Sequence, residues 1–225
     1  MTMFLWKLKS RIDTFLKSFF LFKNILPRYI SNLPDDIFFI EIGANDGIEF
    51  DPLYKSVIAK KWSGVYIEPQ KLVYEKLVAN FKGIPNLFFE NIAITENEME
   101  IPIYSPDSKV VDENSLIASM SSEKGVLRHF SKNQIKKEIV QGKPFKYIID
   151  KYQLKSRQKI LLLIDVEGFE KEIIFGLNLN DFKPKYLIFE HAHLTYDIHR
   201  EINSFLVKFG YKIYLDEFDT LATIK

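Results

Sequence analysis

Short apolar runs alternate with segments of helical spacing through most of the chain beyond residue 35. Residues 38–42 are almost continuously apolar, which is typical of a strand covered on both faces. Residues 159–165 form the most apolar run and predict a central strand. Further strands are predicted at 64–68, 87–89, 186–190, 211–215 and 220–224, and helices at 52–61, 70–80, 169–175 and 197–209. This order favours an α/β fold with a mostly parallel sheet, helices on both faces and a C-terminal antiparallel hairpin.

Two segments depart from this alternation of strands and helices. Residues 1–34 form a basic, amphipathic helical segment with apolar residues at helical spacing. Such a helix packs on the body of the protein or on a second copy in a homo-oligomer, or residues 1–30 contact an anionic membrane surface. Residues 95–150 predict an insertion of hairpin and loops that holds the acceptor-binding region. The whole of 35–225 is expected to form one domain.

Charge and composition limit the classes of binding partner that the chain is expected to have. Lys and Arg number 31 against 30 Asp and Glu, and the net charge of +1 argues against a nucleic-acid-binding protein. The expected partner is a small-molecule or glycan acceptor. Because the chain has no cysteine, disulfides, zinc–thiolate sites and thiol nucleophiles are excluded. No apolar run has the roughly 18–20 residues of a membrane span and no secretory signal is recognisable. A cytoplasmic location is therefore expected, peripheral at the inner membrane face if residues 1–30 bind lipid.

A glycine-cornered turn follows the strand at 38–42 and runs from Gly43 to Gly47. Glycines at both ends permit a tight turn and a close approach of backbone amides to a ligand. Glu68 ends the next strand about twenty residues further on, the separation expected of an acid that accepts hydrogen bonds from a ribose. A nicotinamide cofactor would favour glycine where Asn45 stands, because its pyrophosphate lies against the backbone there. The turn therefore predicts a nucleoside cofactor without a pyrophosphate, such as S-adenosylmethionine.

S-adenosylmethionine carries an adenosine and a cationic amino-acid tail, and the strand ends offer groups for both. Glu41, Asn45 and Asp46 are candidate acceptors for the ammonium group or the positive centre. After the third strand, Asn91 or a backbone amide is expected to contact the adenine, and Ile92 to pack on its face. The predicted cofactor-binding residues are Glu41, Gly43, Ala44, Asn45, Asp46, Gly47, Glu68, Pro69, Asn91, Ile92 and Ala93.

Candidate catalytic residues follow the two later parallel strands. Asp165 closes the most apolar strand, where an acid must be paired, solvated in a cleft or bound to a ligand. Glu190, His191 and His193 follow one another at the end of the next strand; in an extended chain both histidines point to one side and Glu190 to the other. Asp165, His191 and His193 are the predicted catalytic residues, because a carboxylate or histidine takes the proton of an attacking hydroxyl. Each histidine has a purely structural role as its alternative.

The alternative role of these side chains is to bind a divalent cation. Asp165, Glu190 and His191 form a mixed carboxylate and imidazole set suited to Mg²⁺ or Mn²⁺, which would acidify a sugar hydroxyl. Glu167 and Glu170 follow Asp165 in the sequence. They are expected near the first turn of the next helix, where acids interact favourably with the helix dipole.

These strand ends resemble the FkbM-type methyltransferases, a branch of the class I S-adenosylmethionine-dependent enzymes. The motifs that carry the resemblance are FIEIGANDG at 39–47, GVYIEP at 64–69, LIDVEGFE at 163–170, FEHAHL at 189–194 and DTLA at 219–222. They occur in the family's order over about residues 35–225. The resemblance implies a Rossmann-like, seven-stranded sheet and methyl transfer to a hydroxyl of a sugar or of a glycosylated natural product. It also implies that Glu41 through Gly47, Glu68 and the Asn91 region hold the cofactor.

The sequence thus predicts an S-adenosylmethionine-dependent O-methyltransferase acting on a sugar hydroxyl. The acceptor is expected to be a nucleotide-linked sugar, a surface glycan or a glycosylated metabolite. A nicotinamide-dependent oxidoreductase is the alternative among enzymes, and Asn45 disfavours it. The alternative outside enzymes is a non-catalytic, membrane-docked subunit with the same fold.

Overall fold

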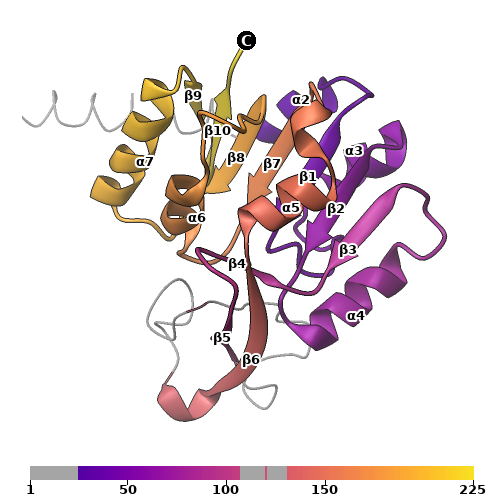
Figure 1. The fold of residues 1–225 in the computed structure, drawn as a ribbon, viewed down its shortest axis with the longest axis vertical. Helices are drawn as coiled ribbons and strands as arrows, with labels where there is room; N and C mark the ends of the chain where they lie inside the picture. Colours follow the sequence, from indigo (N-terminus) through magenta and orange to yellow (C-terminus); the bar gives the residue numbers. More distant parts are fainter. Residues whose placement is uncertain (1–24, 107–119, 121–130) are drawn as a thin grey trace, which may run out of the picture.

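The computed structural model describes residues 25–106, 120 and 131–225, with a seven-stranded sheet at its centre (Figure 1). The strands of this sheet are β1 (Phe38–Ile42), β2 (Ser63–Ile67), β3 (Leu87–Glu90), β7 (Ile160–Ile164), β8 (Tyr186–Glu190), β9 (Lys212–Leu215) and β10 (Asp219–Thr223). Their order is β3-β2-β1-β7-β8-β10-β9, in which β10 is antiparallel to both neighbours and the other strands are parallel. The predicted sheet with its C-terminal antiparallel hairpin is confirmed.

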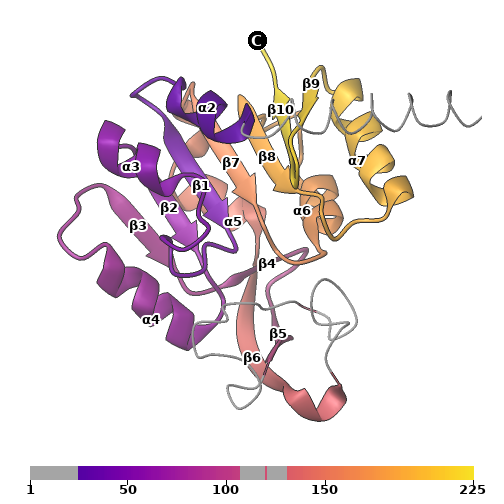
Figure 2. The ribbon, with the colours of Figure 1, turned by 180° about the vertical axis from the view of Figure 1, so that it is seen from behind.

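Helices cover both faces of the sheet, as the sequence predicts (Figures 1 and 2). One face carries α2 (Ile25–Ser31), α3 (Tyr54–Lys60) and α4 (Lys71–Asn80), and the other carries α5 (Phe145–Lys151), α6 (Glu170–Gly176) and α7 (Tyr196–Lys208). All of β7 is buried, with Leu161 and Leu163 in the core of the first face and Leu162 and Ile164 in that of the second. Coverage on both faces accounts for the continuous apolar run in this strand.

A second, three-stranded sheet lies beyond the carboxyl ends of the parallel strands (Figure 1). Its strands are β4 (Ala93–Thr95), β5 (Met99–Pro106) and β6 (Ile135–Pro144), in the order β4-β6-β5, and the short 3₁₀ helix η2 (Lys132–Gln134) precedes β6. The antiparallel pair of β5 and β6 is the hairpin expected within 95–150. The end of that segment forms α5, whose apolar side chains are buried in the main core, and η3 (Leu154–Ser156) then leads to β7.

The described part of the N-terminal segment belongs to the body of the protein. Leu26 and Ile30 of α2 are buried in the core of the face that α3 and α4 cover. The backbone N–H of Leu26 donates a hydrogen bond to Asp216, between β9 and β10, at 2.8 Å. The rest of the predicted amphipathic segment, residues 1–24, lies outside the described residues. Within the described ranges, no helix combines the length and the apolar character needed to cross a membrane.

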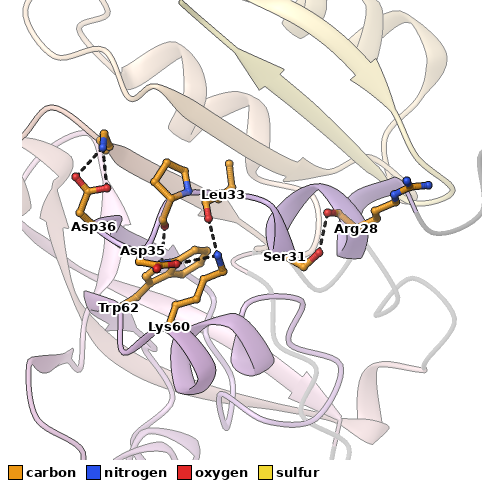
Figure 3. A network of polar contacts seen from close by, with 9 residues as sticks. Arg28, Ser31, Leu33, Asp35, Asp36, Lys60 and Trp62 are labelled. Atoms are coloured by element: carbon orange, nitrogen blue, oxygen red, sulfur yellow. Dashed lines mark hydrogen bonds and ion pairs between the residues drawn. The ribbon is translucent and has the colours of Figure 1, made fainter.

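Polar contacts fix the chain between α2 and β1 (Figure 3). Lys60 Nζ donates to the carbonyl of Leu33 at 2.6 Å and pairs with Asp35 at 3.0 Å. The indole N–H of Trp62 donates to the carbonyl of Pro34 at 2.9 Å. These bonds satisfy backbone carbonyls of a segment that has no regular structure of its own, and they hold it against α3 and β2.

Substitution of Gly64 by alanine is expected to destabilise the fold by about 1–3 kcal/mol, because it overpacks a filled core. Gly64 on β2 lies opposite Phe39 on β1, and an added Cβ would approach the fully buried Phe39 ring to 2.2 Å. Urea unfolding measures the loss. Gly176→Ala is the matched control, because an added Cβ at that helix end meets nothing within 4 Å. Equal midpoints for the two variants would contradict this account of the core.

Candidate active site

A cavity of about 640 Å³ lies at the carboxyl ends of β1, β2, β7 and β8. Its volume is within the roughly 300–1,000 Å³ typical of small-molecule sites. Ile94 of β4 and Ile103 of β5 contribute to its wall, so the second sheet helps to enclose it. Ligands of open α/β sheets bind at this edge, beyond the strand ends.

Most of the predicted cofactor residues line this cavity. They are Glu41, Gly43, Ala44, Asn45, Glu68, Pro69, Ile92 and Ala93. Asp46 belongs instead to the support of the turn, since one carboxylate oxygen accepts the backbone N–H groups of Ile48 and Glu49 at 3.0 and 2.9 Å. The other oxygen pairs with Lys76 at 2.9 Å. The Asp46 carboxylate is therefore occupied by the protein itself.

The two glycines of the turn are required by packing. Gly43 has φ of +82°, and a Cβ there would lie 1.7 Å from the carbonyl oxygen of Asp165. Gly47 has φ of +72°, and a Cβ there would lie 2.4 Å from the ring of Phe81 and 2.7 Å from Leu77 on α4. Gly43 thus lets β1 end directly against the β7 terminus, while Gly47 seats the turn on the following helix.

Glu68 ties the end of β2 to this turn. Its Oε2 accepts the backbone N–H of Asn45 at 3.0 Å, and its Oε1 accepts that of Gln70 at 2.8 Å. The side chain is only 4% exposed, and its burial raises the pKa to about 7. The side chain of Gln70 donates to this carboxylate as well. A carboxylate accepts about four hydrogen bonds, so one acceptor position is left for a ligand hydroxyl group.

Asn91 joins the ends of β2 and β3. Its side-chain amide donates to the carbonyls of Glu68 and Pro69, each at 2.9 Å. The structure therefore places this amide nitrogen on protein backbone and not in the cavity lining. Ile92 and Ala93, which follow it, are buried and offer an apolar surface to the cavity.

The cavity is strongly acidic. Its described lining contains eight carboxyl groups and no Lys, Arg or His; they belong to Glu41, Glu49, Asp51, Glu68, Asp165, Glu167, Glu190 and Asp219. Sequence analysis did not identify Glu49 and Asp51, because they lie in a loop whose path was not predicted, and it included Asp219 only as part of the DTLA motif. Sites lined by one sign of charge attract ligands of the opposite charge.

Burial and mutual repulsion keep several of these acids protonated near neutral pH. Burial, followed by repulsion from Glu167, Glu170 and Asp219, raises the pKa of Asp165 to about 8. The Asp165 side chain faces the cavity and is reached by solvent there. The protein atoms around the cavity still displace much of the water that would otherwise hydrate the carboxylate, and this loss of hydration raises the pKa. Burial and the charge of Asp165 raise the pKa of Glu190 to about 9.

Glu41 is the most deeply buried of the group. It is 3% exposed, and its Oε2 has no hydrogen-bond partner. Burial, followed by the charges of Asp51 and Asp165, raises its pKa well above the usual range. A buried acceptor without a donor is costly in the free protein, so this oxygen is suited to a donor brought by a ligand.

The two predicted catalytic histidines lie in different surroundings. His191 Nδ1 is 3.0 Å from Thr220 Oγ1, and its ring stacks on His199 at 4.5 Å. Burial, with the nearby His199, lowers its pKa to about 4. His191 is absent from the described cavity lining, and it is not brought together with Asp165 as a metal ligand.

His193 lies in other surroundings, with its Nε2 3.3 Å from Glu167 and 3.6 Å from Glu190.

The condition under which both histidines would point to one side, an extended chain, is not met here. β8 ends at Glu190, and the N–H of Leu194 donates to the carbonyl of His191 at 3.1 Å, which closes a turn. This turn returns His193 to the side of Glu190.

Acidic side chains from three places meet beside Asp165. Glu170 Oε1 accepts the N–H groups of Val166 and Gly168, each at 3.1 Å, so it supports the start of α6 as the sequence suggests. Its Oε2 is buried without a hydrogen-bond partner. Asp165, Glu170 and Glu190 offer oxygens within 4.8 Å of one another, and Glu167, Glu190 and His193 form a second such group.

These features define a class I methyltransferase fold, with its ligand cavity at the carboxyl edge of the sheet. Residues 41–213 match the family described as the methyltransferase FkbM domain. The chain belongs to this family, and its class is that of the S-adenosylmethionine-dependent methyltransferases. Family membership favours the methyltransferase prediction over a nicotinamide-dependent oxidoreductase.

A solved structure with a TM-score above 0.5 shows the same fold. The methyltransferase FkbM from Methylobacillus flagellatus KT is 14% identical with a TM-score of 0.57, over 92% of this chain and 50% of that chain. The present chain thus spans about half the length of the Methylobacillus protein. A precorrin-6y C5,15-methyltransferase from Geobacter metallireducens matches at 12% identity and a TM-score of 0.45, over 88% of this chain and 87% of its own. A search of curated proteins found no match.

The acidic cavity makes the stability of the ligand-free protein depend on pH. Asp165 and Glu190 have pKa values of about 8 and 9 in the folded chain, above those of exposed carboxyl groups. The folded state therefore binds more protons, and stability falls as pH rises towards 9. The melting temperature is expected to fall between pH 6 and pH 9 by at least about 2 °C, the shift that roughly 1 kcal/mol gives in a domain of this size.

Glu190→Gln is expected to flatten this pH dependence, because it removes one of the groups that ionise in the window. Glu75→Gln is the matched control, since Glu75 is exposed on α4 and does not line the cavity. A Glu190→Gln curve parallel to the wild-type curve would refute the assignment. Scanning calorimetry in buffers of equal ionic strength provides the measurement.

Proposed function

We propose that the protein transfers a methyl group from S-adenosylmethionine to a hydroxyl group of a sugar. The observation that carries the proposal is the arrangement of the cavity, in which the Gly43 turn, Glu68 and Asp165 lie at adjacent strand ends. The acceptor would be a nucleotide-linked sugar, a surface glycan or a glycosylated metabolite. Acceptor selection is assigned to the segment 95–150, part of which lines the cavity.

The residues present fit the cofactor. Glu41 offers a buried, unpartnered oxygen to an ammonium or sulfonium group, and Glu68 offers its remaining acceptor position to a ribose hydroxyl. Ile92 and Ala93 offer apolar surface to an adenine ring. When bound, S-adenosylmethionine supplies a methyl group activated by a positively charged sulfur. The described lining carries no cationic side chain that would repel this charge.

Asp165 is proposed to take the proton of the acceptor hydroxyl. Its side chain reaches the cavity from the end of β7, next to the turn that follows β1. Its raised pKa, about 8, makes the ionised form a stronger base than an ordinary carboxylate. Since methyl transfer requires an in-line approach of the oxygen, the protein's other contribution is to position the acceptor. His193, paired with Glu167 and Glu190, is the second candidate base.

The location and further partners are part of the same proposal. The enzyme is placed in the cytoplasm, with contact to the inner membrane face through residues 1–30, and a homo-oligomer is the alternative use of that segment. Residues 1–24 lie outside the described part of the chain. The packing of α2 in the core supports neither use over the other.

Glu68→Gln is expected to weaken S-adenosylmethionine binding about tenfold, because hydrogen bonds to a charged acceptor are each worth roughly 1.5–3 kcal/mol. Isothermal titration calorimetry measures the affinity, and the melting temperature of the ligand-free variant checks its fold. Glu75→Gln on the outside of α4 is expected to bind as the wild type does. Unchanged affinity in a folded Glu68→Gln variant would refute the cofactor assignment. Failure of the wild type to bind the cofactor would favour the non-catalytic subunit.

Asp165→Asn is expected to lower kcat about 10²–10⁴-fold, the usual contribution of a general base. A chelator distinguishes this role from a cation site, for which the oxygens of Asp165, Glu170 and Glu190 are the candidate ligands. If Asp165 acts as a base, the chelator leaves wild-type turnover unchanged. Loss of turnover, with recovery on adding Mg²⁺ or Mn²⁺, would assign the three carboxylates to a cation instead.

A further inference from the structure

We infer that the acceptor sugar carries no phosphate or carboxylate group and is either uncharged or aminated. This inference rests on the proposed function and narrows it, since it selects surface glycans and glycosylated metabolites over nucleotide-linked sugars. Two independent features of the cavity carry it: the charge of the wall around Asp165 and a pair of exposed aromatic rings.

Acidic side chains from three described strand ends form part of the wall beside Asp165. Glu167 follows β7, Glu190 ends β8 and Asp219 begins β10, and all three line the cavity. No described Lys or Arg lines the cavity to pair with a phosphate. A phosphate placed here would meet like charge wherever one of these carboxyl groups is ionised, which costs several kcal/mol at a desolvated contact, and it would oppose the ionisation of the others. Sugar hydroxyls and ammonium groups, in contrast, are donors that carboxylates accept.

The acids beside Asp165 exceed what the cofactor needs. Its cationic tail and ribose are assigned to Glu41 and Glu68, at the ends of β1 and β2. In the sheet, β7, β8 and β10 continue from β1 in the direction away from β2. The second set of carboxylates therefore lines the part of the cavity beyond the groups assigned to the cofactor, where the acceptor would bind.

Two aromatic side chains at the cavity are exposed to solvent. Phe50, in the loop after β1, is 96% exposed, and Phe218, just before β10, is 56% exposed. Phe50 also has φ of +61°, which is rare for a bulky side chain. Such strained conformations concentrate at ligand sites. Aromatic faces pack on the C–H faces of sugar rings, while neighbouring carboxylates accept the hydroxyl groups at the ring edge.

The combination selects a ligand more sharply than either feature alone. A purely cationic ligand requires the acids but no aromatic surface, and an apolar ligand requires the rings but would leave the acids unpaired. A nucleoside diphosphate sugar would suit the rings but would bring its phosphates to the acids. An uncharged or aminated sugar is compatible with both features.

The test uses a panel of hexoses, each as its methyl glycoside, its 2-amino derivative and its 6-phosphate. Saturation-transfer NMR measures binding to the full-length protein loaded with S-adenosylhomocysteine, with a chelator present and again with Mg²⁺. Methyl transfer is measured on the same panel. Uncharged or aminated forms are expected to bind at least roughly tenfold more tightly than the phosphate of the same sugar.

Two matched pairs of variants test the two features separately. Phe218→Ala is expected to weaken binding of the uncharged glycoside about three- to tenfold, against no change in Tyr196→Ala, whose ring is 77% exposed but does not line the cavity. Asp219→Asn is expected to reduce the ratio by which the uncharged sugar binds more tightly than its phosphate, because it removes one acid of the wall beside Asp165. Glu75→Gln, on the outside of α4, is expected to leave that ratio unchanged. S-adenosylmethionine affinity is expected to stay constant in all four variants.

The outcomes separate this inference from the proposed function. Binding of an uncharged or aminated sugar without any methyl transfer would support the inference and overturn the proposed function. Equal or tighter binding of the phosphate, with or without Mg²⁺, would overturn the inference even if methyl transfer occurs. Binding of no member of the panel would overturn it as well.

Discussion

The close contact between Gly43 and the carbonyl of Asp165 is the constraint on which the site depends. A Cβ at Gly43 would lie 1.7 Å from that oxygen, so only glycine allows the end of β1 to lie against the end of β7. The N–H of Asp165 donates to the carbonyl of Ile42, and the N–H of Gly43 to that of Ile67. These bonds join the ends of β2, β1 and β7 side by side. The cofactor turn and the candidate base therefore face one cavity.

The same proximity has an electrostatic consequence. Carboxyl groups from separate strands are brought together without a described Lys or Arg in the cavity lining, and burial raises the pKa of several of them. Groups that serve the fold alone would be expected to be paired or hydrogen-bonded. Glu41 and Glu190 each keep a buried oxygen without a hydrogen-bond partner. Such a site is less stable when empty, and a cationic or donor-rich ligand compensates for this when it binds.

The extent to which the sequence predicts this structure depends on how local each feature is. The strands of the main sheet follow from apolar runs, and Glu68 follows from its separation from the glycine turn, because both are set within a few dozen residues. The turn after β8 is not visible in the pattern, so the alternation expected of an extended chain does not give the position of His193 relative to Glu190. Glu167, Glu190 and Asp219 lie together because β7, β8 and β10 are neighbours in the sheet, and this order is not encoded in any local pattern. Ile103 lines the cavity because the second sheet packs there, which local patterns do not predict either.

Glu170 and Glu68 show why local rules and site chemistry overlap at the same residue. A carboxylate has two oxygens, and in Glu170 one supports the start of α6 while the other remains buried beside Asp165 and Glu190. Glu68 lines the cavity; its two oxygens accept two backbone amides and the Gln70 side chain and keep one further acceptor position. An interpretation that assigns each acid either to a helix start or to a ligand is therefore incomplete. The structural role fixes the orientation of the carboxylate, and that orientation presents the remaining acceptor to the site.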